Sequence, residues 1–142
     1  MSEDTIFGKI IRKEIPADIV HEDDLCLAFR DITPQAPIHI LVIPKKPIPK
    51  LSAAAPEDKE LLGHMLLTVK SIAEKEGLSN GYRVVINTDQ DGGQTVFHLH
   101  MHILGGNKLG PMVDQSYRDE KGKHWETILS FKKLVIQEIL NW

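Results

Sequence analysis

The chain has 142 residues, of which 42% are hydrophobic and 26% are charged, and its formal net charge is −3. The length predicts one domain, and the slightly acidic balance gives no electrostatic reason to expect binding to nucleic acid. Because there is no run of about 18 apolar residues and no apolar signal-peptide core, we expect no membrane span and a cytoplasmic or nuclear protein.

The only cysteine, Cys26, stands in the apolar run 25–29. A single cysteine excludes an intramolecular disulfide and any CxxC metal site, which fits a reducing compartment. A small residue in such a run is expected in the hydrophobic core rather than as a nucleophile.

The first 50 residues predict one short helix and three strands. Asp4 is expected to cap the helix, which ends before Pro16 and has an apolar stripe of Ile6, Phe7, Ile10 and Ile11. Segments 17–21 and 25–29 flank an acidic turn and predict a β-hairpin. A loop with two prolines then leads to the strand 39–43.

The strongest helical pattern covers residues 57–76, where apolar residues recur at spacings of three and four, and Gly77 ends it. His64 falls on the polar face of this helix and is expected to be a solvated surface residue. Residues 82–86 predict a further strand, and the polar loop 87–93 returns the chain into a last strand that runs antiparallel to it.

Beyond Gly106 the character of the sequence changes. Residues 107–123 contain few apolar side chains and are expected to form an exposed arm. A last amphipathic helix is expected from about residue 124, with an apolar face available to pack across a subunit interface.

Three of the seven histidines, His98, His100 and His102, recur at every second position within residues 95–106. Side chains alternate between the two faces of a strand, so the three imidazoles would share one face. The residues between them would line the opposite, core face: Phe97, Leu99, Met101 and Ile103.

Three interpretations of these histidines compete. They could be ordinary strand residues, or they could bind a metal ion, since histidine is the commonest zinc ligand. Cα atoms four residues apart on a strand are roughly 13 Å apart, so one strand offers two of the three to a metal, which leaves open a pair plus His39. In the third interpretation an imidazole attacks phosphorus, and the Gly-Gly-Gln-Thr approach at 92–95 supplies donors for a phosphate. No P-loop or dinucleotide-binding glycine motif is present.

Three blocks of the sequence, 4–17, 29–46 and 91–106, resemble the histidine triad (HIT) superfamily, in particular its Hint branch of purine nucleoside phosphoramidases. The last block contains the signature in which three histidines alternate with apolar residues. The resemblance implies an α+β, HIT-like fold with an antiparallel sheet of about five strands and two main helices. The helix expected at the C-terminus is additional to this fold. The resemblance also implies a homodimer, no cofactor and no metal.

The resemblance further implies a role for each site residue. His100 would be the nucleophile, His98 and His102 would flank it to position and protonate, and His39 would complete a hydrogen-bonded relay. Asp31 would accept the ribose hydroxyls. The base pocket would consist of Ile6, Phe7, Ile10, Phe29 and Ile32, and the phosphate and leaving group would be held by Asn87, Gly93, Gln94, Thr95 and Val96.

The predicted activity is hydrolysis of a purine nucleoside 5′-phosphoramidate, of the adenosine 5′-monophosphoramidate type, to the nucleoside monophosphate and an amine. The alternatives are a diadenosine polyphosphate hydrolase of the same superfamily and a nucleotide-binding regulatory or scaffold module. Residues 1–106 would form the catalytic HIT-like part. Residues 107–142 would be a C-terminal extension of the same domain, longer than the short tail typical of the branch.

Overall fold

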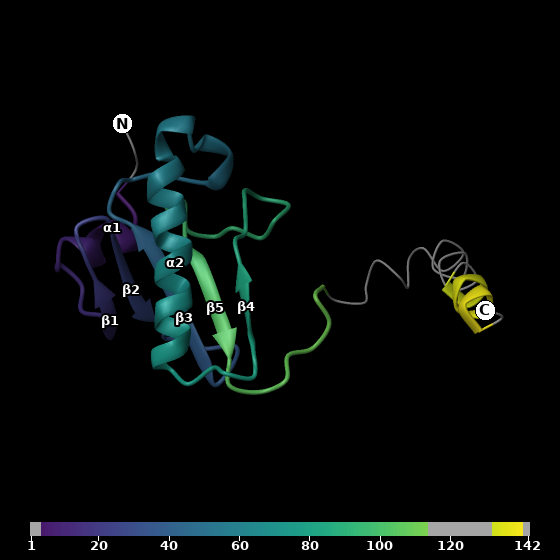
Figure 1. The fold of residues 1–142 in the computed structure, drawn as a ribbon. Helices are drawn as coiled ribbons and strands as arrows, with labels where there is room; N and C mark the ends of the chain where they lie inside the picture. The colour runs from purple at the N-terminus through teal and green to yellow at the C-terminus, as the bar shows by residue number, and fades with distance from the viewer. Residues whose placement is uncertain (1–3, 114–131, 141–142) are drawn as a thin grey trace. The chain divides into compact units, whose positions relative to one another are not determined.

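The computed structural model describes residues 4–113 and 132–140 of the chain. The chain divides into two compact units, one that extends to Leu109 and one that begins at Gly110. The first unit contains the sheet, both long-range hydrophobic clusters and all the histidines discussed above (Figure 1). No helix among the described residues is long and apolar enough to cross a membrane.

The first unit is built on a five-stranded antiparallel sheet with the order β1-β2-β3-β5-β4 (Figure 1). This confirms the expected α+β class, the hairpin near the N-terminus and the antiparallel pairing of the last two strands. The strands are β1 (Ile19–Glu22), β2 (Cys26–Arg30), β3 (Ile38–Pro44), β4 (Tyr82–Val85) and β5 (Met101–Gly105).

Two helices pack on this sheet, α1 (Ile6–Ile11) and α2 (Lys59–Lys75), and two short 3-10 helices, η1 (Leu51–Ala53) and η2 (Pro56–Asp58), precede α2. The prediction that Asp4 caps α1 is wrong. The cap is Thr5, whose hydroxyl accepts a hydrogen bond from the Gly8 N–H at 3.1 Å. Asp4 instead accepts two hydrogen bonds from the Arg12 guanidinium, at 2.8 and 2.9 Å.

The two faces of the sheet are covered by different helices. Side chains alternate along β2 and β3, so each strand contributes to both faces. On one face α2 packs on a buried cluster of Cys26, Ala28, Ile40, Val42, Met65, Val69, Ile72, Ala73, Leu78, Met101 and Ile103. On the other face α1 packs on Leu27, Phe29, Leu41 and Ile43 through Phe7 and Ile10. Cys26 is fully buried, as expected.

The predicted strand through all three histidines is too long. Strand β5 begins at Met101, and residues 94–100 have neither helix nor strand structure. The Leu99 N–H donates to the Ile48 carbonyl at 2.7 Å, which diverts this stretch away from the ladder with β3. Phe97 is 45% exposed rather than part of the core, whereas Leu99, Met101 and Ile103 are buried as predicted.

His64 also differs from expectation. Its side chain is 38% exposed, and its Nε2 atom lies 2.7 Å from Asp23 Oδ2, which belongs to the β1–β2 turn. The contact joins residues 41 positions apart, so the helical pattern alone could not reveal it.

The predicted C-terminal helix is present over residues 132–140, whose side chains are exposed. Its expected first part, 124–131, and most of the expected arm lie outside the described residues. Residues 107–113 have neither helix nor strand structure.

Candidate active site

A cavity of about 470 Å³ opens on the α1 face of the sheet. Its walls come from α1, the segment that follows it, the β2–β3 loop and the loop that precedes β5. Of the residues expected at a nucleotide site, the following line it: Ile6, Phe7, Ile10, Phe29, Asp31, Ile32, Asn87, Gly93, Thr95, Val96, His100 and His102. The cavity therefore brings together residues from sequence positions 6 to 102.

Three of the expected site residues do not line the cavity: His39, Gln94 and His98. Gln94 is buried and braces the loop instead. Its amide nitrogen donates to the carbonyls of Pro49 and Val96 at 2.8 and 3.0 Å, and its amide oxygen accepts from the Asp89 N–H at 2.8 Å. Its side chain thus supports the shape of the loop before β5 from behind.

The hydrogen bond of His100 determines which of its ring nitrogens is free. His100 Nδ1 lies 2.8 Å from the carbonyl oxygen of His98, which can only accept, so Nδ1 carries the proton. In the neutral ring Nε2 then has the lone pair. Because His100 lines the cavity, this arrangement leaves a nucleophilic nitrogen on a ring whose orientation is held by the backbone.

His39 and His102 form a second hydrogen-bonded pair next to it. The Gln35 N–H donates to His39 Nδ1 at 3.1 Å, so His39 carries its proton on Nε2 and donates it to His102 Nδ1 at 2.9 Å. His102 therefore holds its own proton on Nε2, an atom that is buried without a hydrogen-bond partner among the described residues. The two rings are thus joined by a hydrogen bond, and the second of them lines the cavity.

His98 has a different position from its two neighbours. Its ring is buried, and its Nε2–H donates to the carbonyl of Pro44, the last residue of β3, at 2.7 Å. The His98 ring thus anchors the stretch before β5 to β3. The backbone carbonyl of His98 in turn orients the ring of His100. Its contribution to the site geometry is positioning.

Burial governs the electrostatics of the four imidazoles. Desolvation lowers the pKa of His39, His98 and His100 below the usual value, because the charged form loses its hydration. For His102 burial acts together with repulsion from His100 and His39, and its pKa falls to about 4. All four rings are consequently neutral near pH 7, which is the state that a nucleophilic imidazole requires.

Aromatic and acidic neighbours complete the surroundings of His100. The ring of Phe7 on α1 meets that of His100 edge-on, with centroids 5.0 Å apart, and it meets Phe29 at 5.5 Å. Asp31 stands at the end of β2, where its Oδ1 accepts from the backbone N–H of Thr33 at 2.9 Å. Its other oxygen lies 3.6 Å from His39 Nε2.

The glycines before β5 lie in a loop whose backbone segments pass close to one another. A Cβ on Gly92 would lie 2.4 Å from the Thr88 carbonyl oxygen, so only glycine fits there. Gly93 has φ of 82°, a left-handed conformation that glycine adopts without strain. The loop therefore needs these glycines for its own shape.

Asp31, His39 and His102 also place three potential metal-ligand atoms within 4.8 Å of one another. The two histidines use the facing nitrogens to bond each other, so a metal ion here would have to displace their hydrogen bond. The donor set could hold a metal only at the cost of the relay.

Several cavity residues were not anticipated from the sequence. They are Ile15, Pro16, Ala17, Arg30, Thr33, Gln35 and Leu41. Arg30 lies between Phe29 and Asp31, and Thr33 follows Ile32, so adjacency to expected site residues is the signal that points to both. Leu41 lies opposite His102 in the β3–β5 register, which only strand pairing reveals.

Comparison with known proteins gives consistent matches. Residues 12–109 match the model of the HIT domain. The chain is 72% identical to an uncharacterized HIT-like protein of Synechococcus elongatus over 109 residues. The match covers 77% of this chain and 96% of that protein. It is 55% identical to the purine nucleoside phosphoramidase of Escherichia coli over 114 residues. That match covers 80% of this chain and 96% of the relative. The crystal structure of a histidine triad protein from Clostridium difficile matches with a TM-score of 0.76 and 43% identity, over 80% of this chain and 99% of that chain.

Proposed function

Because the chain belongs to the HIT domain family, we propose that it hydrolyses purine nucleoside 5′-phosphoramidates to a nucleoside monophosphate and an amine. The observation that carries the proposal is the 2.8 Å contact between His100 Nδ1 and the His98 carbonyl oxygen, which puts the ring proton on Nδ1 and leaves the lone pair of Nε2 for a substrate in the cavity. The substrate class rests on the name of the Escherichia coli relative.

The first step is attack of His100 Nε2 on the phosphorus. A bond forms between this nitrogen and phosphorus while the P–N bond to the leaving nitrogen breaks, and that nitrogen takes up one proton from solvent water, so that it leaves as the neutral amine. His102 Nε2–H has no hydrogen-bond partner among the described residues, and the His102 and His100 rings have centroids 4.9 Å apart, so we assign this N–H to hydrogen bonds with the phosphoryl oxygens, in which it keeps its proton.

In the second step water attacks the nucleotidyl-histidine. The oxygen of water bonds to phosphorus while the bond between His100 and phosphorus breaks; one proton of that water passes to solvent, the nucleoside monophosphate leaves, and His100 returns to its neutral state. Splitting the reaction into two displacements is the advantage of covalent catalysis. The His39–His102 pair holds the donor in place during both steps.

The apolar part of the cavity suits a flat base. Ile6, Ile10 and Phe29 line it, and Asp31, which also lines the cavity, offers a carboxylate for the ribose hydroxyls. We place the phosphate between His100, His102 and the loop that contains Gly93 and Thr95.

We assign the catalytic part to residues 1–106 and regard 107–142 as an extension of it. The end of the HIT match at residue 109 supports this boundary. We also propose that the protein is a homodimer, as in the family that the sequence resembles. The mass in solution, measured by light scattering, tests this directly.

The test of the activity is turnover of adenosine 5′-monophosphoramidate by the wild type and by His100→Ala. We expect the variant to lose on the order of 10⁴-fold or more in kcat, because no other group replaces the nucleophile. Quenched wild-type reactions should contain a nucleotidyl adduct, detected by mass spectrometry on the peptide that contains His100. Turnover that survives in His100→Ala would overturn the mechanism.

A second substrate separates the related activity. If the protein hydrolyses a diadenosine polyphosphate faster than the phosphoramidate, the proposed substrate class is wrong, although His100 would still be the nucleophile. The control variant is His64→Ala, since His64 lies outside the cavity and should leave both rates unchanged.

A further inference from the structure

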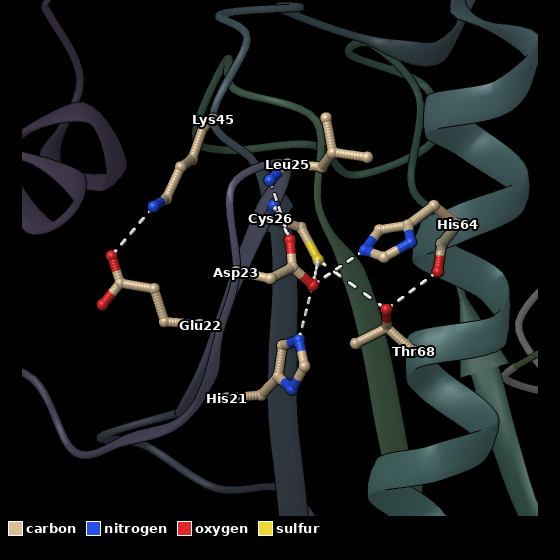
Figure 2. A network of polar contacts seen from close by, with 8 residues as sticks. All are labelled: His21, Glu22, Asp23, Leu25, Cys26, Lys45, His64 and Thr68. Atoms are coloured by element: carbon tan, nitrogen blue, oxygen red, sulfur yellow. Dashed lines mark hydrogen bonds and ion pairs between the residues drawn. The ribbon is translucent and has the colours of Figure 1, made fainter.

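A second group of polar side chains lies where the β1–β2 turn meets α2. Figure 2 shows the rings of His21 and His64 and the thiol of Cys26 pointing toward the carboxylate of Asp23. His21 Nε2 and His64 Nε2 each lie 2.7 Å from Asp23 Oδ2, and Cys26 Sγ lies 3.6 Å from the same oxygen. None of these residues has a role in the proposed reaction.

The carboxylate of Asp23 is oriented by the backbone. Its Oδ1 accepts hydrogen bonds from the N–H groups of Leu25 and Cys26 at 2.8 and 2.9 Å. These bonds leave Oδ2 to face the two imidazoles and the thiol. Burial alone would raise the pKa of Asp23, but the hydrogen bonds from His21, His64 and the backbone hold it well below its usual range, so the group is an anion near pH 7.

The thiol of Cys26 forms the buried floor of the cluster. The residue is fully buried, and its Sγ lies 3.8 Å from the hydroxyl oxygen of Thr68, which itself donates to the carbonyl of His64 at 2.8 Å. The imidazoles of His21 and His64 are 24% and 38% exposed. The cluster therefore has a closed floor and an open side from which an ion can enter.

We propose that these four side chains bind one Zn²⁺ or similar divalent transition-metal ion, through Asp23 Oδ2, Cys26 Sγ and the two imidazole Nε2 atoms. Ligand atoms of His21, Asp23 and Cys26 already lie within 4.8 Å of one another, and His64 reaches the same carboxylate oxygen. Two nitrogens, one oxygen and one sulfur are a donor set that tetrahedral Zn²⁺ accepts.

Three of the four ligands need little adjustment, whereas His64 is not within 4.8 Å of every other ligand atom, so its ring must move closer to the group by more than about 1 Å. Metal–ligand distances of about 2.0 to 2.3 Å in a tetrahedron place the ligand atoms roughly 3.3 to 3.7 Å apart, which the Cys26–Asp23 separation of 3.6 Å already satisfies. The two imidazoles must each withdraw by about half an ångström from Asp23 Oδ2. Binding releases the thiol proton to solvent and moves the proton of each ring to Nδ1.

This site is separate from the candidate active site. Cys26 belongs to the hydrophobic cluster under α2, whereas Phe7 and Leu41, beside the catalytic histidines, belong to the cluster on the opposite face. A bound ion would join the β1–β2 turn to α2 and stabilise that contact without touching the reacting groups. The inference thus stands independently of the proposed reaction.

The test is a titration of the metal-free wild-type protein with Co²⁺, a spectroscopic substitute for Zn²⁺. Because the chain has a single cysteine, a thiolate-to-cobalt charge-transfer band can arise only from Cys26. We expect this band together with visible absorption of tetrahedral intensity, at one ion per chain, and loss of both when Zn²⁺ is added. Absence of the charge-transfer band at saturating Co²⁺ would overturn the proposal.

Variants identify the other ligands. His21→Phe and His64→Gln should each weaken Co²⁺ affinity by about tenfold or more, and Cys26→Ser should abolish the band. Glu22→Gln is the matched control, because the Glu22 carboxylate is engaged by Lys13 and Lys45 and should not affect affinity. His100→Ala should also retain the band.

Two outcomes discriminate further. A band that persists at full affinity in both His21→Phe and His64→Gln would overturn the four-ligand site. Cys26→Ser should keep the wild-type rate on the phosphoramidate, and thermal melts without metal report whether each variant is folded. Loss of activity in a folded Cys26→Ser would contradict the separation of the two sites.

Discussion

The two faces of the sheet use histidine in opposite ways. On the α1 face the rings are buried and bond to backbone groups and to each other, as His100 does with the His98 carbonyl. The carboxylate of Asp31 lies 3.6 Å from His39 Nε2. On the α2 face, His21 and His64 are partly exposed and share the carboxylate of Asp23 at 2.7 Å.

This difference in surroundings changes the chemistry of the same side chain. Backbone acceptors and burial keep an imidazole neutral with one defined free nitrogen, which suits a nucleophile and a donor. A shared carboxylate beside a thiol converges several ligand atoms on one point, which suits a metal ion. The partner of a histidine therefore indicates its role better than its position in the sequence does.

The largest expected contrast is catalytic. His102→Ala should lower kcat by about 10²- to 10⁴-fold, because it removes the free donor and the acceptor for His39. His64→Ala, on the other face, should keep the wild-type kcat. Steady-state turnover of adenosine 5′-monophosphoramidate measures both, and an equal fall in the two variants would break the distinction between the faces.

The second contrast concerns pH. The folded-state pKa of all four rings near the cavity is lowered, to about 4 for His102. Below pH 6.5 the unfolded chain therefore binds protons that the folded chain does not, so the free energy of unfolding should fall as pH drops from 6.5 toward 4. The rate of hydrolysis should also fall as the pH drops over this range, because the His100 nucleophile must be neutral.

Urea denaturation at a series of pH values tests this dependence. His102→Gln removes one of the titrating groups, so its stability should decline less steeply than that of the wild type. Parallel curves for the two proteins would show that protonation of this ring does not control the acid sensitivity.

The third contrast is structural, and it applies to the metal-free protein. Asp23→Ala should lower the free energy of unfolding by about 1 to 3 kcal/mol, because the N–H groups of Leu25 and Cys26 and two imidazoles lose their acceptor. Asp24→Ala, one residue away and exposed, should leave stability unchanged. Chemical denaturation compares them, and equal stabilities would mean that water replaces Asp23 at no cost.

The smallest expected effect tests the aromatic support of His100. Phe7→Leu removes edge-to-face contacts with His100 and Phe29 and should cost about 1 kcal/mol of stability. Phe97→Leu is the matched control at a position that is 45% exposed, and it should have no measurable effect. If both changes were neutral, the ring of Phe7 would contribute shape alone.

Much of the fold followed from local patterns. The spacing of apolar residues predicted α2 and its end near Gly77, and the apolar runs predicted the strands of the sheet. Most of the residues that the alternating histidines and the resemblance indicate line one cavity, and His39, Gln94 and His98 lie outside its lining. These features can be predicted from the sequence because the spacing of apolar residues and the residue types in turns depend only on residues close together in the chain.

The errors arose where distant residues decide the outcome. The alternating pattern predicts a strand through all three histidines, but a hydrogen bond from the Leu99 N–H to the Ile48 carbonyl keeps the stretch before Met101 out of the sheet. The polar face of α2 predicts a solvated His64, whereas its ring contacts the carboxylate of Asp23, which lies 41 residues earlier in the chain. No local pattern contains either partner.

The sequence by itself therefore determined which residue types are present, the period of each element and the family resemblance. Tertiary structure decided which nitrogen of each imidazole is free, because that depends on acceptors such as the His98 carbonyl and Asp23 Oδ2. It also decided that two histidine clusters lie on opposite faces of one sheet. The physical reason is that hydrogen-bond partners and burial are set by packing between segments far apart in the chain.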